Sequence, residues 1–318
     1  MLKLNKKIYA VLMLLLLSSG DMARSATTED LTKIGMGARP IGMGRAFVAV
    51  ANDSNSIFTN PSGLSNLKSW EITSMYTSFF EGDLNYVVLG MTKPFSFGTF
   101  GVGLISTGTG QILSPNPSGG TFFDYYDRML ILSFSENHPF KLKDSNIYLG
   151  LNLKYFQKGF SGSVTSNGKG VNADIGIKII PKSDLSFGFL LQNFLPTSIV
   201  YDTGSSDDIA SYLKAGISKH FFGKKITFAF DVDVPLKRST LIPITFHSGL
   251  EYNANKNLCL RLGIDQDISA SSQTSTSLAA GVGLKIKTFS FDYAYKPFSE
   301  SGLSATHFIS VTIKGVEN

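Results

Sequence analysis

The sequence predicts an all-β fold, a fourteen-stranded antiparallel transmembrane β-barrel with an N-terminal plug segment. Three observations predict it. Apolar residues alternate with polar or small residues in many segments, which is the period of a β-strand that has two different faces. Short and long connections alternate along the chain, as they do in outer-membrane barrels. The chain also begins with a segment typical of an export signal. Only 17% of its residues are charged, against ~25% in an average soluble domain.

The first element, residues 1–25, is expected to be a cleaved signal peptide. Ten consecutive apolar residues, 8–17, follow a lysine-rich start, and the residues 23–25 provide a cleavage site. This run is too short to cross a bilayer, which takes about 20 residues. The chain carries a formal charge of +5, of which residues 1–25 contribute +3, so the remainder carries +2. The basic balance therefore comes mostly from the signal and does not indicate nucleic-acid binding.

Residues 26–66 are predicted to form the plug. They do not alternate in polarity, and they are rich in glycine, which lets a backbone approach its neighbours closely. A barrel of fourteen strands is wider than the eight-stranded barrels whose interiors are filled by side chains alone. A compact segment that precedes the first strand therefore has a lumen to occupy.

Residues 67–318 are predicted to form the barrel. The alternation is clear at 226–234, where Ile, Phe and Val at even positions oppose Thr, Ala and Asp at odd positions. Most of the predicted strands have about 10 to 13 residues, enough to cross a membrane at a tilt. Fourteen such segments lie near 68–80, 84–93, 97–107, 126–138, 145–157, 168–180, 184–194, 209–220, 224–235, 243–254, 257–266, 276–287, 288–297 and 304–314.

The connections indicate which end of the barrel is which. Turns such as 93–96 and 253–256 are short, whereas 108–125, 158–167 and 195–208 are long and rich in Gly, Ser, Asp and Pro. Short turns face the periplasm in outer-membrane barrels, so both termini are expected on that side. A soluble β-sandwich would carry many charges on its outward face, but one face of these strands is continuously apolar. We therefore expect an outer-membrane location in contact with lipid.

A family resemblance rests on both ends of the chain. The run GARPIGMGRAFVAVANDSNSIFTNPSGLSNL, residues 37–67, resembles the N-terminal signature of the PorV/PorQ family, which is related to FadL-type outer-membrane transporters. The run DYAYKPF, residues 292–298, resembles the C-terminal part of that family. Two features depart from it: Arg45 stands where the family usually has Gly, and the chain does not end on Phe. The plug motif comprises Gly37, Arg39, Gly42, Gly44, Arg45, Asn60 and Pro61.

The resemblance implies two alternative functions. FadL-type members pass small hydrophobic molecules through a plugged barrel and its wall. PorV-type members act in type nine secretion, where they handle exported cargo proteins or partner subunits. The sequence by itself leaves both open. Aromatic side chains suit either partner. The candidate contact residues are Phe58 in the predicted plug, Phe122 and Phe123 in the first long loop, and the inward-facing Tyr148 and Tyr212.

Enzyme chemistry is not expected, and neither is a cofactor or a metal. The four His residues are scattered without metal-ligand spacing, and the chain has no G-x-S-x-G nucleophile motif. His247 is expected to face water in the lumen, and the single Cys259 is expected to be packed and inert. Inward charges of both signs are expected to pair across the lumen or with Arg39 and Arg45; they are Lys154, Asp174, Lys178, Lys214, Asp231, Asp233, Glu251, Arg261, Asp265, Lys285 and Asp292.

Overall fold

The computed structural model describes residues 26–28, 31–79, 82–110, 112–114, 120–163, 165–181, 183–237, 243–268, 274–297 and 306–316. The predicted signal peptide therefore lies outside the described residues, and it stays a prediction. Within the described ranges, no helix combines the length and the apolar character needed to cross a membrane.

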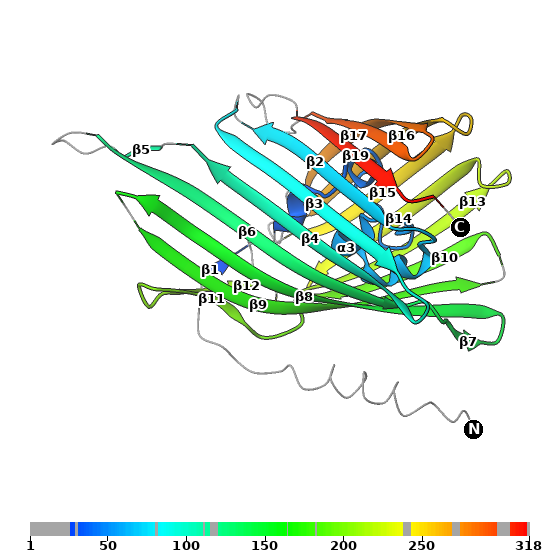
Figure 1. The fold of residues 1–318 in the computed structure, drawn as a ribbon, viewed down its shortest axis with the longest axis horizontal. Coiled ribbons are helices and arrows are strands. Elements are labelled where there is room, and N and C mark those ends of the chain that lie inside the picture. Colours follow the sequence, from blue (N-terminus) through cyan, green and yellow to red (C-terminus); the bar gives the residue numbers. More distant parts are fainter. Residues whose placement is uncertain are drawn as a thin grey trace, which may run out of the picture.

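Fourteen long strands of the described chain form one closed antiparallel barrel (Figure 1). The sheet closes where the last strand pairs with the first, with Ile309 opposite Tyr76. All fourteen predicted strands are confirmed to within a few residues. They are β2 (Glu71–Phe79), β3 (Leu84–Pro94), β4 (Gly98–Thr109), β6 (Thr121–Glu136), β8 (Ser145–Gly162), β9 (Ser166–Pro181), β10 (Leu185–Gln192), β13 (Tyr212–Phe221), β14 (Ile226–Pro235), β15 (Ile244–Asn253), β16 (Leu258–Ile268), β17 (Thr274–Ile286), β18 (Phe289–Lys296) and β19 (Thr306–Lys314).

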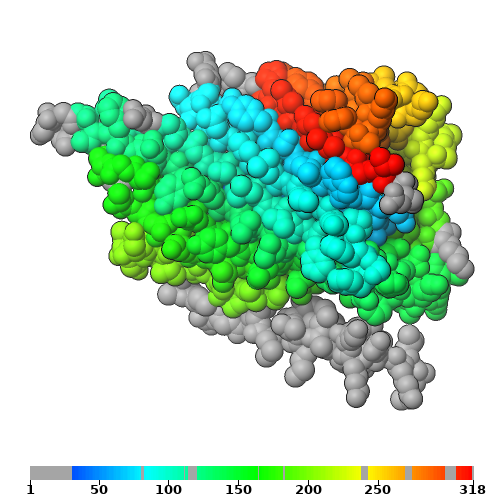
Figure 2. Space-filling model, viewed as in Figure 1, coloured from blue at the N-terminus to red at the C-terminus, as the bar shows by residue number. Residues whose placement is uncertain are grey.

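The wall is not equally tall around the barrel (Figures 1 and 2). Strands β6, β8 and β9 have 16, 18 and 16 residues, whereas β13, β14 and β15 have 10 each. The extra length lies at the end of the long connections, here called the long-loop end; the opposite end is the short-turn end. The tall wall corrects the predicted loop 158–167, because β8 continues to Gly162 and β9 begins at Ser166. Inward aromatic rings contact each other there, and the ring centroids of Phe160 and Tyr125 are 5.5 Å apart.

Five short strands complete the sheet: β1 (Ala26–Thr28), β5 (Ile112–Ser114), β7 (Phe140–Leu142), β11 (Ser198–Tyr201) and β12 (Ser206–Ile209). The predicted loop 195–208 thus contains the β11–β12 hairpin. Strand β1 pairs in parallel with β12, with Ala26 opposite Asp207. This pairing places Ala26–Thr28 at the long-loop end, whereas the sequence had led us to expect both termini at the short-turn end.

The barrel has an apolar outside and a polar, buried inside. Outward side chains such as Leu132, Leu262 and Ile309 are about half exposed. Inward polar groups such as Asn152 and Asp231 are almost completely buried. This distribution is the reverse of that in a soluble domain, whose apolar side chains are the buried ones. The buried polar groups have a partner to contact, because the chain before β2 lies inside the barrel.

Residues 31–66, here called the inner segment, fill much of the lumen. They comprise η1 (Leu31–Ile34), α2 (Ala38–Gly42), α3 (Ser56–Thr59) and η2 (Pro61–Asn66), joined by tight turns. Close backbone approaches connect them to opposite sides of the wall, from Gly150 on β8 to Gly281 on β17. Asn60 ends α3 and caps η2, since its side chain accepts a hydrogen bond from the backbone N–H of Ser62.

Candidate functional site

The inner segment runs along the lumen from one end to the other. At the long-loop end, the Tyr86 hydroxyl donates to the carbonyl of Leu31 (3.1 Å), and the Gln192 amide donates to the hydroxyl of Thr32 (2.7 Å). At the short-turn end, the chain leaves through Leu67 and enters β2 at Glu71. Anything that passes through the barrel must therefore pass along the surface of this segment, or the segment must move.

Arg39 of α2 is the centre of an ion-pair network between the inner segment and the wall. Its guanidinium donates to both carboxylate oxygens of Glu251 (2.8 and 2.9 Å), to Asp53 (2.6 Å) and to the Asn52 side chain (2.8 Å). Arg261 reaches the same Glu251 (2.8 Å), so the carboxylate is held by two guanidinium groups. Paired, fork-like contacts of this kind are the strong form of the buried ion pair. The network ties the inner segment to β15 and β16.

The charge balance around Asp53 is set by Arg39. Burial raises the pKa of the Asp53 carboxyl, but the adjacent Arg39 guanidinium outweighs burial and holds that pKa below its ordinary value. Asp53 also accepts hydrogen bonds from the backbone and side-chain N–H groups of Asn55 (2.9 and 3.0 Å). The carboxylate therefore stays ionised in the lumen and organises the turn that precedes α3.

Arg45 makes the second ion-pair network, at the long-loop side of the first. Its guanidinium contacts Asp265 (3.2 Å) and donates to the carbonyl of Lys33 (2.7 Å). Asp265 also contacts Lys296 (2.6 Å) and His247 (2.6 Å). His247 is 2% exposed, which corrects the expectation that it faces water. The inner segment covers it, and the carbonyl of Gly44 lies 3.1 Å from its Nδ1.

Charged wall residues also bind the uncharged backbone of the inner segment. The Asp231 carboxylate accepts from the N–H of Val48 (2.7 Å), and the Lys178 ammonium donates to the carbonyls of Val50 (3.1 Å) and Ala51 (2.6 Å). The pairing of wall charges with the plug motif was expected from the sequence, but this use of backbone groups was not. The side chains of residues 47–51 are apolar. The sequence does not indicate which backbone N–H and C=O groups bind wall charges.

The opposite side of the lumen is apolar. Phe58 of α3 lies against Gly103 on β4 and Gly90 on β3, where an added Cβ would come within 2.6 and 3.2 Å of the Phe58 ring. Around it lies an apolar cluster that continues along the wall. Its inward wall residues are Met75, Tyr86, Val88, Ile105, Met129, Ile131, Phe156 and Phe308. This strip, here called the apolar lane, extends toward the long-loop end, where Phe79 and Tyr201 pack against it. The inward ion pair between Lys158 and Asp127 (3.9 Å) separates it from the rings of Phe123, Tyr125 and Phe160.

Two glycines of the plug motif allow the backbone of the inner segment to touch the wall. A Cβ on Gly42 would lie 3.1 Å from the Cα of Gly281. Gly44 has a φ of 58°, and a Cβ on Gly263 would collide with the backbone nitrogen of Gly44. Side chains at these contacts would force the segment away from β16 and β17, which accounts for glycine on both partners.

The wall itself is interrupted beside this site. The ladder between β9 and β10 ends where Ile175 faces Leu191, and pairing of β9 resumes with β11 at Lys169. Between these points, Asn193 has a φ of 53° and turns the chain out of the strand. Side chains replace part of the missing ladder: Asp174 accepts from the N–H of Asn193 (2.9 Å), as Asn172 does from Leu195 (3.1 Å). One backbone bond crosses the gap, from the N–H of Phe194 to the carbonyl of Ala173 (3.0 Å).

The remaining predicted contact residues lie in different places. Phe122 and Phe123 belong to β6 and not to a loop; Phe122 faces outward and is 51% exposed, and Phe123 faces inward. Tyr148 is partly buried on the inward face of β8 near the short-turn end. Tyr212 is buried under Lys33, whose ammonium lies 4.8 Å from the ring centroid. The structure thus does not gather the five aromatics into one site.

Room for a ligand is small while the inner segment is in place. A cavity of about 40 Å³ lies beside Phe58, between the inner segment, which includes η1, and the wall residues Lys214, Asp233 and His247. It suits a few water molecules, each of which needs roughly 10–15 Å³. In the described part of the chain, no group of three or more His, Cys, Asp or Glu side chains is arranged to hold a metal ion.

Comparisons with known proteins support the fold of the barrel. No protein-family model matches the chain, and no curated protein matches it. Among solved structures, it is similar to the CymD monoaromatic hydrocarbon channel, with a TM-score of 0.65 and 12% identity over 91% of this chain and 99% of that one. It is also similar to the toluene transporter TodX of Pseudomonas putida, with a TM-score of 0.59 and 12% identity over 92% of this chain and 99% of that one. At such identities, the likeness shows a shared fold of hydrocarbon channels and transporters.

Proposed function

We propose that this chain spans a bacterial outer membrane as a barrel of the PorV/PorQ, FadL-like type and moves small hydrophobic molecules past the inner segment, which acts as a plug. The observation that carries the proposal is the apolar lane. It joins Phe79 and Tyr201 at the long-loop end to Phe58 in the middle of the lumen. A water-filled pore would have no use for such a lane, since porin interiors are polar.

The apolar outside of the barrel supports the membrane location. Exposed Leu, Ile, Val and Phe side chains cover the outward face of strands all round the barrel. A patch of this size on a soluble protein would promote aggregation, so a lipid environment accounts for it. The fold that this chain shares with two hydrocarbon channels agrees with transport.

Two routes lead out of the apolar lane. The interruption between β9 and β10 lies beside Ile199, which belongs to the same apolar cluster. A molecule could leave sideways there if the side chains of Asn172 and Asp174 released the backbone they hold. The other route runs along the lumen and requires displacement of the inner segment, because the cavity beside Phe58 is small.

Uptake of labelled toluene and labelled oleate by cells that carry the barrel in their outer membrane tests the proposal. We expect faster uptake of at least one probe than in cells without the barrel. Ile131→Asn should reduce uptake at least roughly five-fold, because a buried amide without partners interrupts the apolar lane. Ile131→Leu, which conserves volume, should retain it. Uptake of both probes at the rate of cells without the barrel would refute transport.

The alternative is a secretion component that binds exported proteins. The observation that favours it is an exposed apolar pair at the tip of the tall wall, Leu113 and Phe122, which lie opposite each other on β5 and β6 and are 57% and 51% exposed. Protein interfaces are enriched in such aromatic and apolar groups. Under this alternative, Phe122→Ser would release a protein that co-purifies at fixed stoichiometry, and Ile131→Asn would not.

A further inference from the structure

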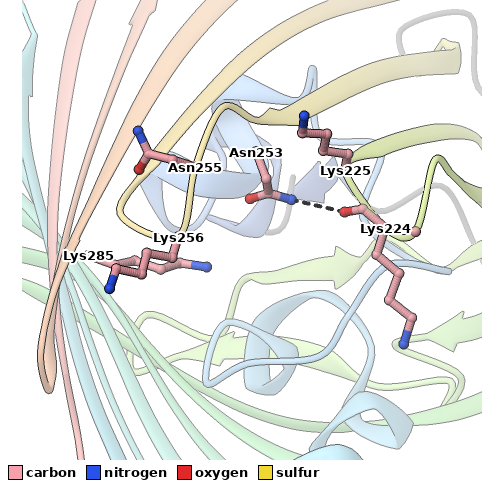
Figure 3. Close-up of a pocket in the computed structure, with 7 residues that line it drawn as sticks. Lys224, Lys225, Asn253, Asn255, Lys256 and Lys285 are labelled. Carbon is pink, nitrogen blue, oxygen red and sulfur yellow. Dashed lines mark hydrogen bonds between the residues drawn. The ribbon is translucent and has the colours of Figure 1, made fainter.

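A cavity at the short-turn end of the barrel is lined by lysines. Its volume is about 450 Å³, and it opens to solvent. None of the described residues that line it is acidic. Figure 3 shows the side chains around this mouth, which we call the lysine basin; they are Lys224, Lys225, Asn253, Asn255, Lys256 and Lys285.

Three neighbouring hairpins supply the lysines, and hydrogen bonds hold these hairpins together. Asn253 at the end of β15 donates through its backbone N–H to the carbonyl of Lys225 (2.8 Å) and through its side chain to that of Lys224 (3.3 Å, Figure 3). The backbone N–H of Lys285 donates to the carbonyl of Asn257 (2.7 Å), and the Asn257 side chain donates back to Lys285. The basin therefore has a fixed backbone frame, although the lysine side chains themselves are exposed.

The lysine basin differs from the rest of the lumen in its charge balance. Elsewhere on the wall, two buried lysines lie against carboxylates: Lys154 is 3.0 Å from Asp174, and Lys214 is 2.7 Å from Asp233. In the basin, four lysines line one cavity whose described lining contains no carboxylate, and their side chains extend in different directions around it (Figure 3). Such a concentration of one sign of charge in a concave site raises the local concentration of anions.

We propose that the lysine basin binds a phosphate group. A phosphate carries several acceptor oxygens and more than one negative charge, which suits several ammonium groups that approach from different hairpins. The volume of the basin accommodates a phosphate with part of the molecule that carries it. The proposal concerns a binding site at the mouth of the barrel and does not depend on what passes through the lumen.

Two sources could present the phosphate, a lipid headgroup or a soluble phosphate compound. Phe222 at the tip of the β13–β14 hairpin is 80% exposed and stands two residues before Lys224 in the chain. An exposed aromatic ring beside lysines is the arrangement that anchors proteins at a membrane surface. This neighbour favours an anionic phospholipid of the leaflet that faces the short-turn end.

Binding measurements on the purified full chain in neutral detergent test the proposal. Native mass spectrometry would measure retention of phosphatidylglycerol, and calorimetry would measure binding of inorganic phosphate. The triple variant Lys224→Ser, Lys225→Ser, Lys256→Ser should bind its ligand at least roughly ten-fold more weakly, because it removes three of the four positive charges that line the basin. The matched control removes three exposed lysines of other short-turn hairpins, through Lys93→Ser, Lys141→Ser and Lys143→Ser.

The outcomes separate the sources and can overturn the proposal. Loss of phosphatidylglycerol in the basin variant, with less than two-fold change in the control, supports a lipid phosphate. Basin-dependent binding of inorganic phosphate without lipid retention supports a soluble source. Equal losses in both variants, or no binding of either probe by the unaltered chain, would overturn the site. Circular dichroism of both variants confirms that the barrel is retained in each comparison.

Discussion

The two sides of the lumen hold the inner segment in different ways. The side formed by β13 to β18 uses charge: Arg39 and Arg45 insert into carboxylates on β15 and β16. The side formed by β2 to β8 uses apolar contact, with Phe58 packed onto glycines of β3 and β4. Charged contacts are directional and fail when one partner is lost, whereas apolar contacts weaken in proportion to the area lost. From this difference we expect that the inner segment can loosen on one side while it stays packed on the other.

The largest expected effect is on the charged side. Arg39→Met leaves Asp53 and part of Glu251 without their cation, and loss of one partner of a buried pair costs about 3–5 kcal/mol. Hydrogen exchange of residues 39–53 should then accelerate roughly hundred-fold or more, since about 1.4 kcal/mol is a factor of ten. Residues 57–66 should change by less than roughly three-fold. Arg39→Lys keeps the charge but loses the paired hydrogen bonds to Glu251, so its exchange of residues 39–53 should accelerate by an intermediate amount. Equal acceleration in both stretches would show that the segment opens as one unit.

A second variant addresses the apolar side. Phe58→Ala removes the ring from the contact with β3 and β4, and buried Phe to Ala changes cost about 3–5 kcal/mol. We expect the lower part of this range here, because neighbouring Ile57 and Leu64 remain buried in the same cluster. Exchange of residues 57–66 should accelerate, and that of 39–53 should stay near its original rate. Phe58→Leu serves as the control. If Phe58→Ala leaves exchange of residues 57–66 unchanged, the apolar side does not hold the segment.

The smallest expected effect is a pH dependence confined to the charged side. The folded pKa of Asp53 lies below its ordinary value because Arg39 outweighs burial. Its contribution to stability is therefore complete above the ordinary pKa near 3.8 and is lost as the pH falls through the lower, folded pKa. Exchange of residues 47–55, corrected for intrinsic rates, should rise several-fold in this range. Asp53→Asn should abolish most of this pH-dependent rise in exchange. If the Asp53→Asn variant retains the full rise, another carboxylate causes it.

Part of the fold and of the site follows from local sequence. The period of two places Asp231, Glu251 and Asp265 on the inward face, and the structure confirms all three there. The expectation that such charges pair with Arg39 and Arg45 is confirmed as well. The prediction of a loop at 158–167 was wrong, because a glycine- and serine-rich composition is typical of a connection. In the structure, pairing with β6 continues as far as Gly162 and extends β8 into this stretch.

The sequence by itself determined the strands, their two faces and the glycine-rich segment that precedes them, because these depend on the order of neighbouring residues. The tertiary structure decided which wall residue each side chain of the inner segment contacts. Arg39 and Glu251 are 212 positions apart, and only the closure of the barrel brings them within 2.8 Å. The same holds for the interrupted wall at Asn193 and for the lysine basin, whose members come from three hairpins. Register and closure are properties of the whole sheet, so no single stretch of sequence encodes them.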